Sequence, residues 1–250
     1  KYGQPRRSIL LYEDEFANLD EEAEVEAYPV HLFFTKEGYF KKITPQSLRM
    51  SGEQKCKEGD EVVEHIEDAL NSWELLFFTD KAQVYKAKAA DFPDTKASVL
   101  GDFIPAKLSM DEGESAIFMA ATADYKGFVL FCFENGKIAK VPLSAYQTKT
   151  NRKKLLGAYS DKSPVVSILY LPEAAEILLL STQGRRLLVH TAAIPEKATR
   201  STQGVQVMTL RRNARLLRAV VYKEGMVPDP ERCRRTIPAI GTLPTAEAMQ

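Results

Sequence analysis

A short apolar motif followed by a turn occurs four times along the chain, and it constrains the fold more than any other feature. Its copies end at positions 38, 82, 136 and 184, which are separated by 44, 54 and 48 residues. Each apolar run is too short for a buried helix and is followed by a second strand-like segment. One hairpin per repeat of this length is typical of a propeller blade. The copies read LFFTKEG (32–38), LFFTDKA (76–82), LFCFENG (130–136) and LLLSTQG (178–184).

The fold class predicted from this repeat is all-β, a propeller-like disc of about four to five four-stranded blades. Three copies end in glycine, which can take a positive φ at a turn. The second copy ends in Ala82 instead. We therefore expect that turn to use another geometry or to accept strain.

Length and composition set the outer limits. A chain of 250 residues with 44% hydrophobic residues can bury a core. No apolar stretch approaches the ~18 residues that would span a membrane, and the first residues lack the apolar core of a signal peptide. We predict a cytoplasmic protein, and a first residue other than Met fits a piece of a longer polypeptide. The three cysteines, Cys56, Cys132 and Cys233, are far apart and are expected to be reduced thiols.

Charge is divided unevenly along the chain. Residues 1–125 hold 14 Lys+Arg and 25 Asp+Glu, whereas residues 126–250 hold 20 and 9. This asymmetry predicts an acidic segment and a basic surface for a polyanion. The early acidic run is either a solvated leader or a strip that covers the basic surface when nucleic acid is absent. Three regions are predicted: a leader strand and acidic segment (1–28), the disc (29–225) and a C-terminal tail (226–250).

A lysine recurs in the strand after three of the four turns. Lys42, Lys86 and Lys140 each lie four positions beyond the turn, where Leu188 stands in the fourth copy. Alternation along a strand places them opposite the core-facing residues. They are either ordinary solvated charge or an arc of cations around the disc. A curved duplex could lie on such an arc, because phosphate neutralisation needs no base contacts.

Other basic candidates lie in loops between the predicted strands. Mobile cations near glycine can approach a phosphate backbone, and hydroxyl groups add sequence-neutral contacts. The alternative for each is plain solvated charge. The loop candidates are Lys149, Arg152, Lys153 and Lys154, then Arg200 in RSTQG, and the pairs Arg185, Arg186 and Arg211, Arg212.

The motifs together resemble a known family. KYGQPRRS before an acidic stretch, hairpins of the form LFFT..G..KK, and TRSTQGVQVMTL (199–210) are similar to the C-terminal domain of the A subunit of bacterial type IIA topoisomerases, over about residues 1 to 222. The resemblance implies a β-pinwheel, whose blades exchange strands and whose perimeter binds and bends double-stranded DNA. It also implies, as partners, the rest of the A subunit, through which the ATPase B subunit is engaged, and a nucleoid-associated location.

One departure from the family concerns the first blade. Gyrase A subunits carry a basic heptapeptide, QRRGGKG, whereas the corresponding region here reads SLRMSGEQKCKEGD (47–60). Only 21 residues separate Gly38 from Gly59, against 31 from Ala82 to Gly113, so the region looks shortened. This favours a topoisomerase IV-like or divergent parent enzyme over a supercoiling one.

No catalytic motif is found. The sequence has no phosphate-binding P-loop, no nucleophile elbow and no recognisable Cys/His pairing, and His65 has no second histidine at metal spacing. We predict a binding domain that is not an enzyme by itself, without cofactor or metal. The alternative is a propeller that serves as a protein-interaction scaffold, using apolar edges without a polyanion.

Overall fold

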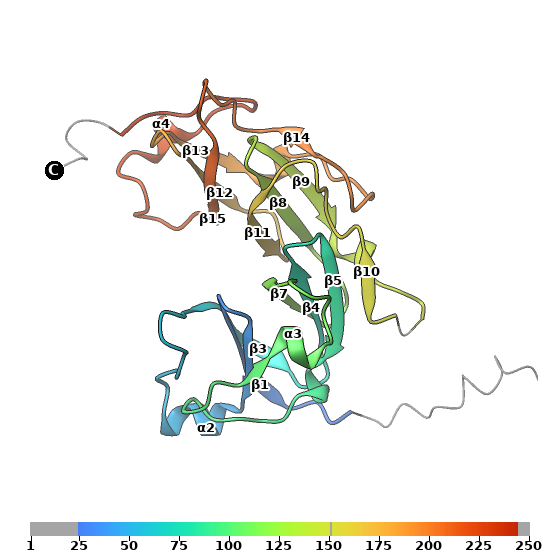
Figure 1. Ribbon diagram of the computed structural model, residues 1–250. Helices are drawn as coiled ribbons and strands as arrows, with labels where there is room; N and C mark the ends of the chain where they lie inside the picture. Colours follow the sequence, from blue (N-terminus) through green and yellow to red (C-terminus); the bar gives the residue numbers. More distant parts are fainter. Residues whose placement is uncertain (1–24, 151, 245–250) are drawn as a thin grey trace, which may run out of the picture.

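Four antiparallel sheets follow one another along an arc in the computed structural model, which describes residues 25–150 and 152–244 (Figure 1). Each of the four predicted hairpins forms part of one sheet. The hairpins are β1 (Pro29–Thr35) with β2 (Tyr39–Ile43), β4 (Glu74–Thr79) with β5 (Gln83–Lys88), β8 (Phe128–Phe133) with β9 (Lys137–Pro142), and β12 (Glu176–Ser181) with β13 (Arg186–His190). The predicted repeat is therefore confirmed.

A third strand in each sheet pairs with the first strand of the hairpin. These strands are β3 (Val62–Leu70), β7 (Ala116–Thr122), β11 (Val165–Leu171) and β15 (Leu216–Val221). The residue after each apolar run donates its backbone N–H to the loop before this strand, as in Lys36 N to Glu61 O (2.9 Å) and Asp80 N to Ser115 O (3.1 Å). The same contact occurs in the third and fourth blades. The four blades are thus built to one plan.

The outer strand of each of the first three blades comes from beyond the next hairpin. β6 (Asp102–Phe103) pairs with β2, β10 (Lys154–Leu156) pairs with β5, and β14 (Val205–Gln206) pairs with β9. The sheet orders are accordingly β3-β1-β2-β6, β10-β5-β4-β7 and β11-β8-β9-β14. This exchange of outer strands makes the fold a β-pinwheel, as predicted.

The C-terminal tail completes the fourth blade, whose sheet is otherwise β13-β12-β15. Arg186 N donates to Thr242 O (2.8 Å) and Thr242 N donates to Arg186 O (2.9 Å). Arg186 lies two residues beyond its turn. Phe40 and Ile138 lie at the same position in the first and third blades, where they pair with Asp102 and Val205 of the outer strands. Thr242 therefore occupies the place of an exchanged outer strand. The boundary predicted at residue 225 separates β15 from the segment that completes its blade.

Short helices connect the strands. One-turn 3-10 helices follow the hairpins at η1 (Ala89–Asp91), η2 (Leu143–Tyr146) and η3 (Thr191–Ala193). The helix α2 (Pro45–Met50) occupies the shortened region of the first blade, where the Thr44 side chain accepts from Ser47 N (3.4 Å). Two further helices are α3 (Ile104–Lys107) and α4 (Pro230–Cys233). The Arg234 guanidinium holds α4 against the fourth sheet, because its Nε and Nη2 donate to the Glu176 carboxylate at 2.6 and 2.8 Å.

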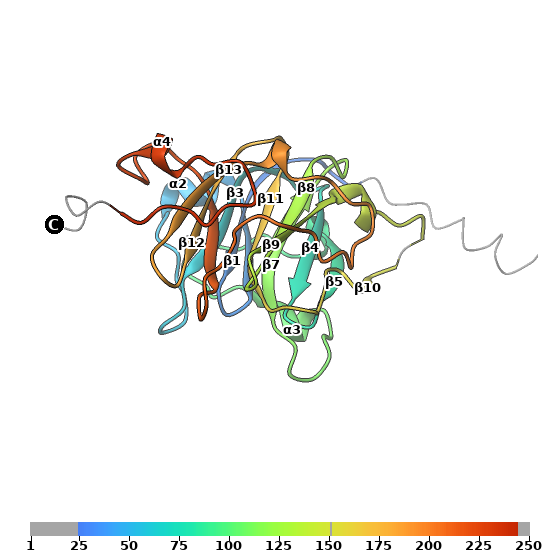
Figure 2. The same ribbon diagram turned by 90° about the horizontal axis from the view of Figure 1, so that it is seen from above.

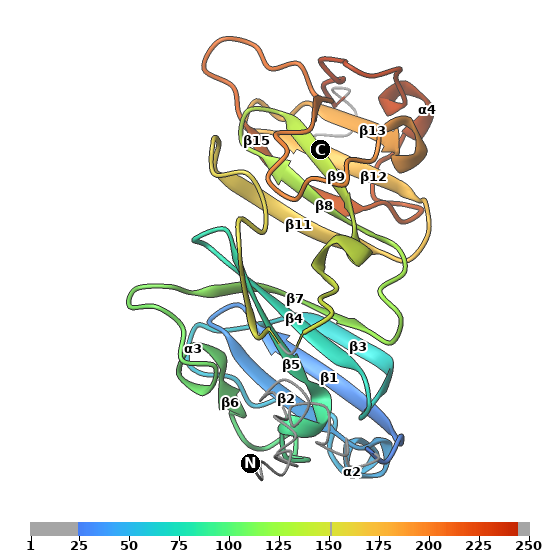
Figure 3. The same ribbon diagram turned by 90° about the vertical axis from the view of Figure 1, so that its right-hand side faces the viewer.

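The core lies between consecutive blades rather than in one layer. Phe34, Phe77 and Phe92 pack between the first and second blades. Phe78 and Phe131, with ring centroids 5.6 Å apart, pack between the second and third. Figure 1 shows the sheets following one another along the arc, and Figures 2 and 3 show the same arrangement from above and from the side. Both faces of an internal sheet are therefore covered by protein.

The turn at Ala82 keeps the geometry of the glycine turns. Gly38, Gly136 and Gly184 have φ of 94°, 81° and 74°, and Ala82 has φ of 53°. Of the two outcomes expected, the chain accepts backbone strain, because the left-handed region is unfavourable for a residue with a Cβ. The three cysteines are free. No helix in residues 25–150 and 152–244 is long and apolar enough to span a membrane. The predicted acidic leader lies largely outside the described residues.

Candidate nucleic-acid interface

The recurring lysines do not form an exposed arc, and this prediction of their position is wrong. Lys42 has a side chain only 2% exposed. Its Nζ donates to Asn71 Oδ1 at 2.6 Å and to Ala89 O at 3.0 Å, and lies 3.4 Å from Asp94 Oδ1. Alternation along the strand does point this side chain to the opposite face from the residues before and after it. It points at the next blade, however, because both faces of the sheet are covered.

Lys140 makes the equivalent contact between the third and fourth blades. Its Nζ donates to Thr191 O (3.2 Å) and lies 4.3 Å from the Phe128 ring centroid. Ala89 and Thr191 are the first residues of η1 and η3, so each lysine joins its blade to the 3-10 helix of the following one. Leu188 stands at this position in the fourth blade and packs with Val227 and Cys233. The periodic lysine is thus a structural contact between blades.

Lys86, the third member of the set, is also largely buried, with a side chain 11% exposed. Its Nζ donates to Thr148 Oγ1 (3.1 Å) and lies 3.7 Å from Glu74 Oε2. The Tyr125 ring centroid is 5.1 Å from the same ammonium group. Lys86 therefore contacts the segment that leads into β10.

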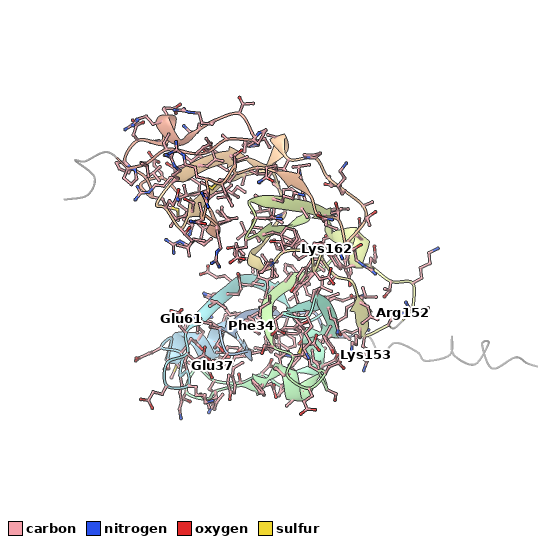
Figure 4. All side chains as sticks on the ribbon, turned by 45° about the horizontal axis from the view of Figure 1, so that its top comes forward. Phe34, Glu37, Glu61, Arg152, Lys153 and Lys162 are labelled. Atoms are coloured by element: carbon pink, nitrogen blue, oxygen red, sulfur yellow. The ribbon has the colours of Figure 1, made fainter. Side chains whose placement is uncertain are left out.

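Exposed cations lie instead in the segments that run from the end of one hairpin to the outer strand of the preceding blade. We call these the crossing segments and name each after the blade whose outer edge it completes. Lys149, Arg152 and Lys153 are exposed before β10. Figure 4 shows Arg152 and Lys153 at the outer edge of the molecule, away from the buried Phe34. We call residues 148–150 and 152–153, which carry these three cations, the basic loop. Its position at the outer strand of the second blade makes its charge accessible to a large ligand.

Lys154, next to the basic loop, is neutralised locally. Its Nζ lies 2.7 Å from Asp111 Oδ2 and 5.3 Å from the Tyr85 ring centroid. The hydrogen bond to Lys154 holds the pKa of Asp111 below its usual value, and Asp111 in turn raises the pKa of Lys154. Tyr85 donates to the buried carboxylate of Glu114 at 2.8 Å. Lys154 therefore anchors β10 on a polar network.

Arg200 joins the crossing segment of the third blade to the outer strand of the second. Its Nη1 donates to Ala145 O (3.2 Å) and its Nη2 to Leu156 O (3.4 Å). The guanidinium carbon lies 6.0 Å from the Tyr146 ring centroid. Arg200 also borders an open basin of about 360 Å³, lined by Ala145, Leu156, Gly157, Ala198, Thr199, Arg200 and Ser201. This basin lies close to the basic loop along the chain, at the C-terminal end of β10.

The remaining arginine candidates fall into two groups. Arg185 and Arg186 are half-buried beside the tail, and Arg185 Nη1 donates to Gly241 O (2.9 Å). Arg211 and Arg212 are exposed in the loop that leads inward to β15. The structure therefore brings Arg200 and the basic loop to neighbouring outer segments and leaves Arg211 and Arg212 on a different loop.

Charge along the outer edge differs between blades. The crossing segment of the first blade carries Asp91, Asp94 and Asp102 against Lys96. Lys197 is an exposed cation on the third blade that the sequence analysis did not select, and Arg232 and Arg235 are exposed on the fourth. Asp94, Glu196 and Arg234 form β-bridges to the residue four positions beyond the turn in their blades. An alignment of the crossing segments on these three residues would have identified the additional cations. Among the crossing segments, accessible positive charge is thus concentrated on the second to fourth blades.

Two histidines that the sequence separates lie together on the first sheet. His31 Nδ1 is 3.2 Å from His65 Nε2, and the His65 ring stacks on Phe33. Burial lowers the pKa of His65. Spacing along the chain could not reveal this pair because its members come from neighbouring strands. No group of three metal-binding side chains occurs in the part of the chain that the structure describes.

The geometry defines a class of fold first, a four-bladed β-pinwheel. Comparison with known proteins agrees. The family described as "DNA gyrase C-terminal domain, beta-propeller" matches residues 74–98 and 175–223. The chain is 23% identical over 235 residues to the DNA gyrase A subunit of Borrelia hermsii, covering 90% of this chain and 29% of the relative. It is 24% identical over 217 residues to the DNA topoisomerase 4 A subunit of Staphylococcus aureus, covering 84% and 27%.

Solved structures show the same fold. The C-terminal domain of DNA topoisomerase IV aligns with a TM-score of 0.73 at 21% identity, over 88% of this chain and 73% of that one. The E. coli ParC C-terminal domain aligns with a TM-score of 0.64 at 14% identity, over 87% and 94%. The chain spans less than a third of the length of its curated relatives. The resemblance to the C-terminal domain of the A subunit of a bacterial type IIA topoisomerase is confirmed.

Proposed function

We propose that this domain binds and bends duplex DNA by sequence-neutral phosphate contacts and performs no catalysis itself. The observation that carries the proposal is the basic loop, whose Lys149, Arg152 and Lys153 are exposed together at an outer strand. Arg200 and Lys197 extend positive charge to the next blade. Cations spaced along an arc favour a curved polyanion, because each additional phosphate contact repays part of the bending energy.

The proposed role within a larger enzyme follows from the relatives. The domain would present a bent duplex to the cleavage core of a type IIA topoisomerase, acting with the rest of the A subunit, which engages the ATPase B subunit. Its first blade has α2 and an irregular segment in place of a basic glycine-rich heptapeptide. This supports a topoisomerase IV-like parent rather than a supercoiling one.

The first prediction concerns DNA affinity and its dependence on salt. Fluorescence anisotropy with two unrelated duplexes should give equal affinities. For about four neutralised phosphates, affinity should fall about 100-fold between 50 and 200 mM salt. Replacing Lys149, Arg152 and Lys153 by alanine should weaken binding and reduce the slope of log affinity against log salt by about 2 to 3. A preference for small DNA circles over linear duplex would report bending.

A matched control removes three lysines from the first blade. Lys36, Lys57 and Lys107 are exposed there, and the variant Lys36→Ala/Lys57→Ala/Lys107→Ala changes net charge by the same amount. We expect it to bind DNA nearly as the unaltered domain does. Equal losses in both triple variants, or affinity independent of salt, would contradict the proposal.

A further inference from the structure

Lys86 contacts the basic loop at both of its ends. Its backbone N–H donates to Lys153 O at 2.7 Å, and its Nζ donates to Thr148 Oγ1 at 3.1 Å. Lys149 and Arg152 lie between these two contacts in the chain. One residue of β5 therefore fixes the start and the end of the loop that carries the exposed cations.

The hydrogen bonds continue from Thr148 into the loop. Thr148 Oγ1 donates to Thr150 O at 2.8 Å, and Arg152 N donates to the same carbonyl at 2.6 Å. A hydroxyl that accepts from Lys86 and donates to Thr150 fixes the orientation of both partners. The path from Lys86 to Arg152 consists of three hydrogen bonds in series.

The charge of Lys86 is satisfied within the protein. Glu74 Oε2 lies 3.7 Å from its Nζ, and the Tyr125 ring centroid lies 5.1 Å away. With only 11% of the side chain exposed, the ammonium group has little surface to offer a phosphate. Lys42 and Lys140, at the same position in other blades, donate to carbonyls of 3-10 helices instead. Among these three lysines, Lys86 alone is bonded to a loop with three exposed cations.

We propose that Lys86 is a positioning residue, which sets the conformation of the basic loop through Thr148 and thereby raises affinity for DNA without contacting it. This inference rests on the proposed function of the loop. A loop held in one conformation loses less conformational entropy on binding than a mobile one. Its cations also keep a fixed spacing against the phosphates.

Two variants test the inference by different chemistry. Lys86→Met removes the charged donor, and Thr148→Val removes the hydroxyl without changing net charge. Each should weaken DNA binding by about fivefold to tenfold, since ordering each immobilised side chain has a free-energy cost on binding. Thr148→Ser keeps the hydroxyl and should retain affinity. Lys42→Met removes the equivalent buried lysine from the first blade and should leave DNA affinity unchanged at temperatures where it is folded.

A cycle with the loop variant separates positioning from direct contact. In the Lys149→Ala/Arg152→Ala/Lys153→Ala background, Lys86→Met should cause no further loss, because its effect acts through those cations. A further loss there, or an equal loss in Lys42→Met, would overturn the inference.

Limited trypsin digestion supplies a readout that does not depend on DNA. Lys86→Met and Thr148→Val should speed cleavage after Arg152 and Lys153 while cleavage elsewhere keeps its rate. Unchanged cleavage would overturn the inference even if DNA affinity fell. Faster cleavage together with normal DNA binding by the triple loop variant would leave the positioning role intact and refute the proposed function.

Discussion

At the scale of the residue, the glycines before the outer strands are the most constrained positions. Gly204 has φ of +71°, and a Cβ placed there would lie 2.0 Å from Ile138 O. Gly101 and Gly241 occupy the same position in the first and fourth blades, with φ of +89° and +79°. The exchanged strand passes so close to the hairpin here that only a residue without a side chain fits.

The prediction at this scale is a large loss of stability in Gly204→Ala. A positive φ costs a residue with a Cβ about 1 to 2 kcal/mol, and a clash with backbone adds about 1 to 3 kcal/mol. Gly184 has φ of +74°, and a Cβ added there would have no neighbouring atom within 4 Å, so Gly184→Ala isolates the first effect. Urea unfolding should show the larger loss for Gly204→Ala. Equal losses would refute the close approach.

At the scale of the element, strand β3 carries a carboxylate in an unfavourable environment. Burial raises the pKa of Glu64 from 4.5 to about 7. Glu64 pairs with Phe34, whose side chain packs between the first two blades. The folded protein therefore holds a proton on Glu64 at pH values where the unfolded chain has released it.

This shift predicts how stability depends on pH. Because the folded pKa is raised, the contribution of Glu64 is fully present below pH 4.5 and is lost as pH rises to about 7. The loss amounts to at most about 3 kcal/mol. Glu64→Gln should be more stable than the unaltered protein at pH 8 and should lack this component of the pH dependence. Glu67→Gln, at a side chain 70% exposed on the same strand, is the control in urea unfolding at pH 5 and pH 8.

The hairpin strands could be predicted from the sequence and the outer strands could not. An apolar run with a turn marks each hairpin, so β1 and β2 and their equivalents were identified. β6 and β14 are two residues long, which is too short to show any alternation. Their pairing depends on the glycine that precedes each of them, which allows a close approach to the hairpin, and on the position of the next blade.

The candidate site was predicted in part, for a related reason. Alternation placed Lys42, Lys86 and Lys140 on one face of their strands, but that face also carries buried core residues such as Phe40. It could not tell solvent from another blade, since stacked sheets bury both faces. The exposed loop cations Lys149, Arg152 and Lys153 were identified because loops lie at the surface whatever the stacking is.

At the scale of the whole molecule, the two end blades differ from the internal ones. No hydrogen bond or ion pair within residues 25–150 and 152–244 joins the first sheet to the fourth. The outward face of the first blade is covered near Phe33 by Leu48 of α2, and that of the fourth near Leu188 by Val227 and Cys233. Terminal repeats of a stack are covered in this way because no neighbouring repeat packs on their outward faces.

The tail gives a prediction at this scale. Removing residues after Ile237 takes away the partners of the Arg186 and Thr209 amides, which donate to Thr242 O and Ala239 O at 2.8 Å each. Hydrogen exchange at both amides should become faster, because their protection depends on these contacts. The amide of Ala89, which donates to Trp73 O in the second blade, should be unaffected. Unchanged exchange at Arg186 would show that the tail does not complete the blade.

The exchange of outer strands has a consequence for how the chain is made. A ribosome delivers each of the first three hairpins well before the strand that will flank it, because one more hairpin must emerge in between. The nascent first blade therefore leaves the outer edge of β2 open until Asp102 has been synthesised. Open strand edges invite pairing with other chains. Translation speed across the second hairpin thus sets how long a growing polypeptide is exposed to that hazard.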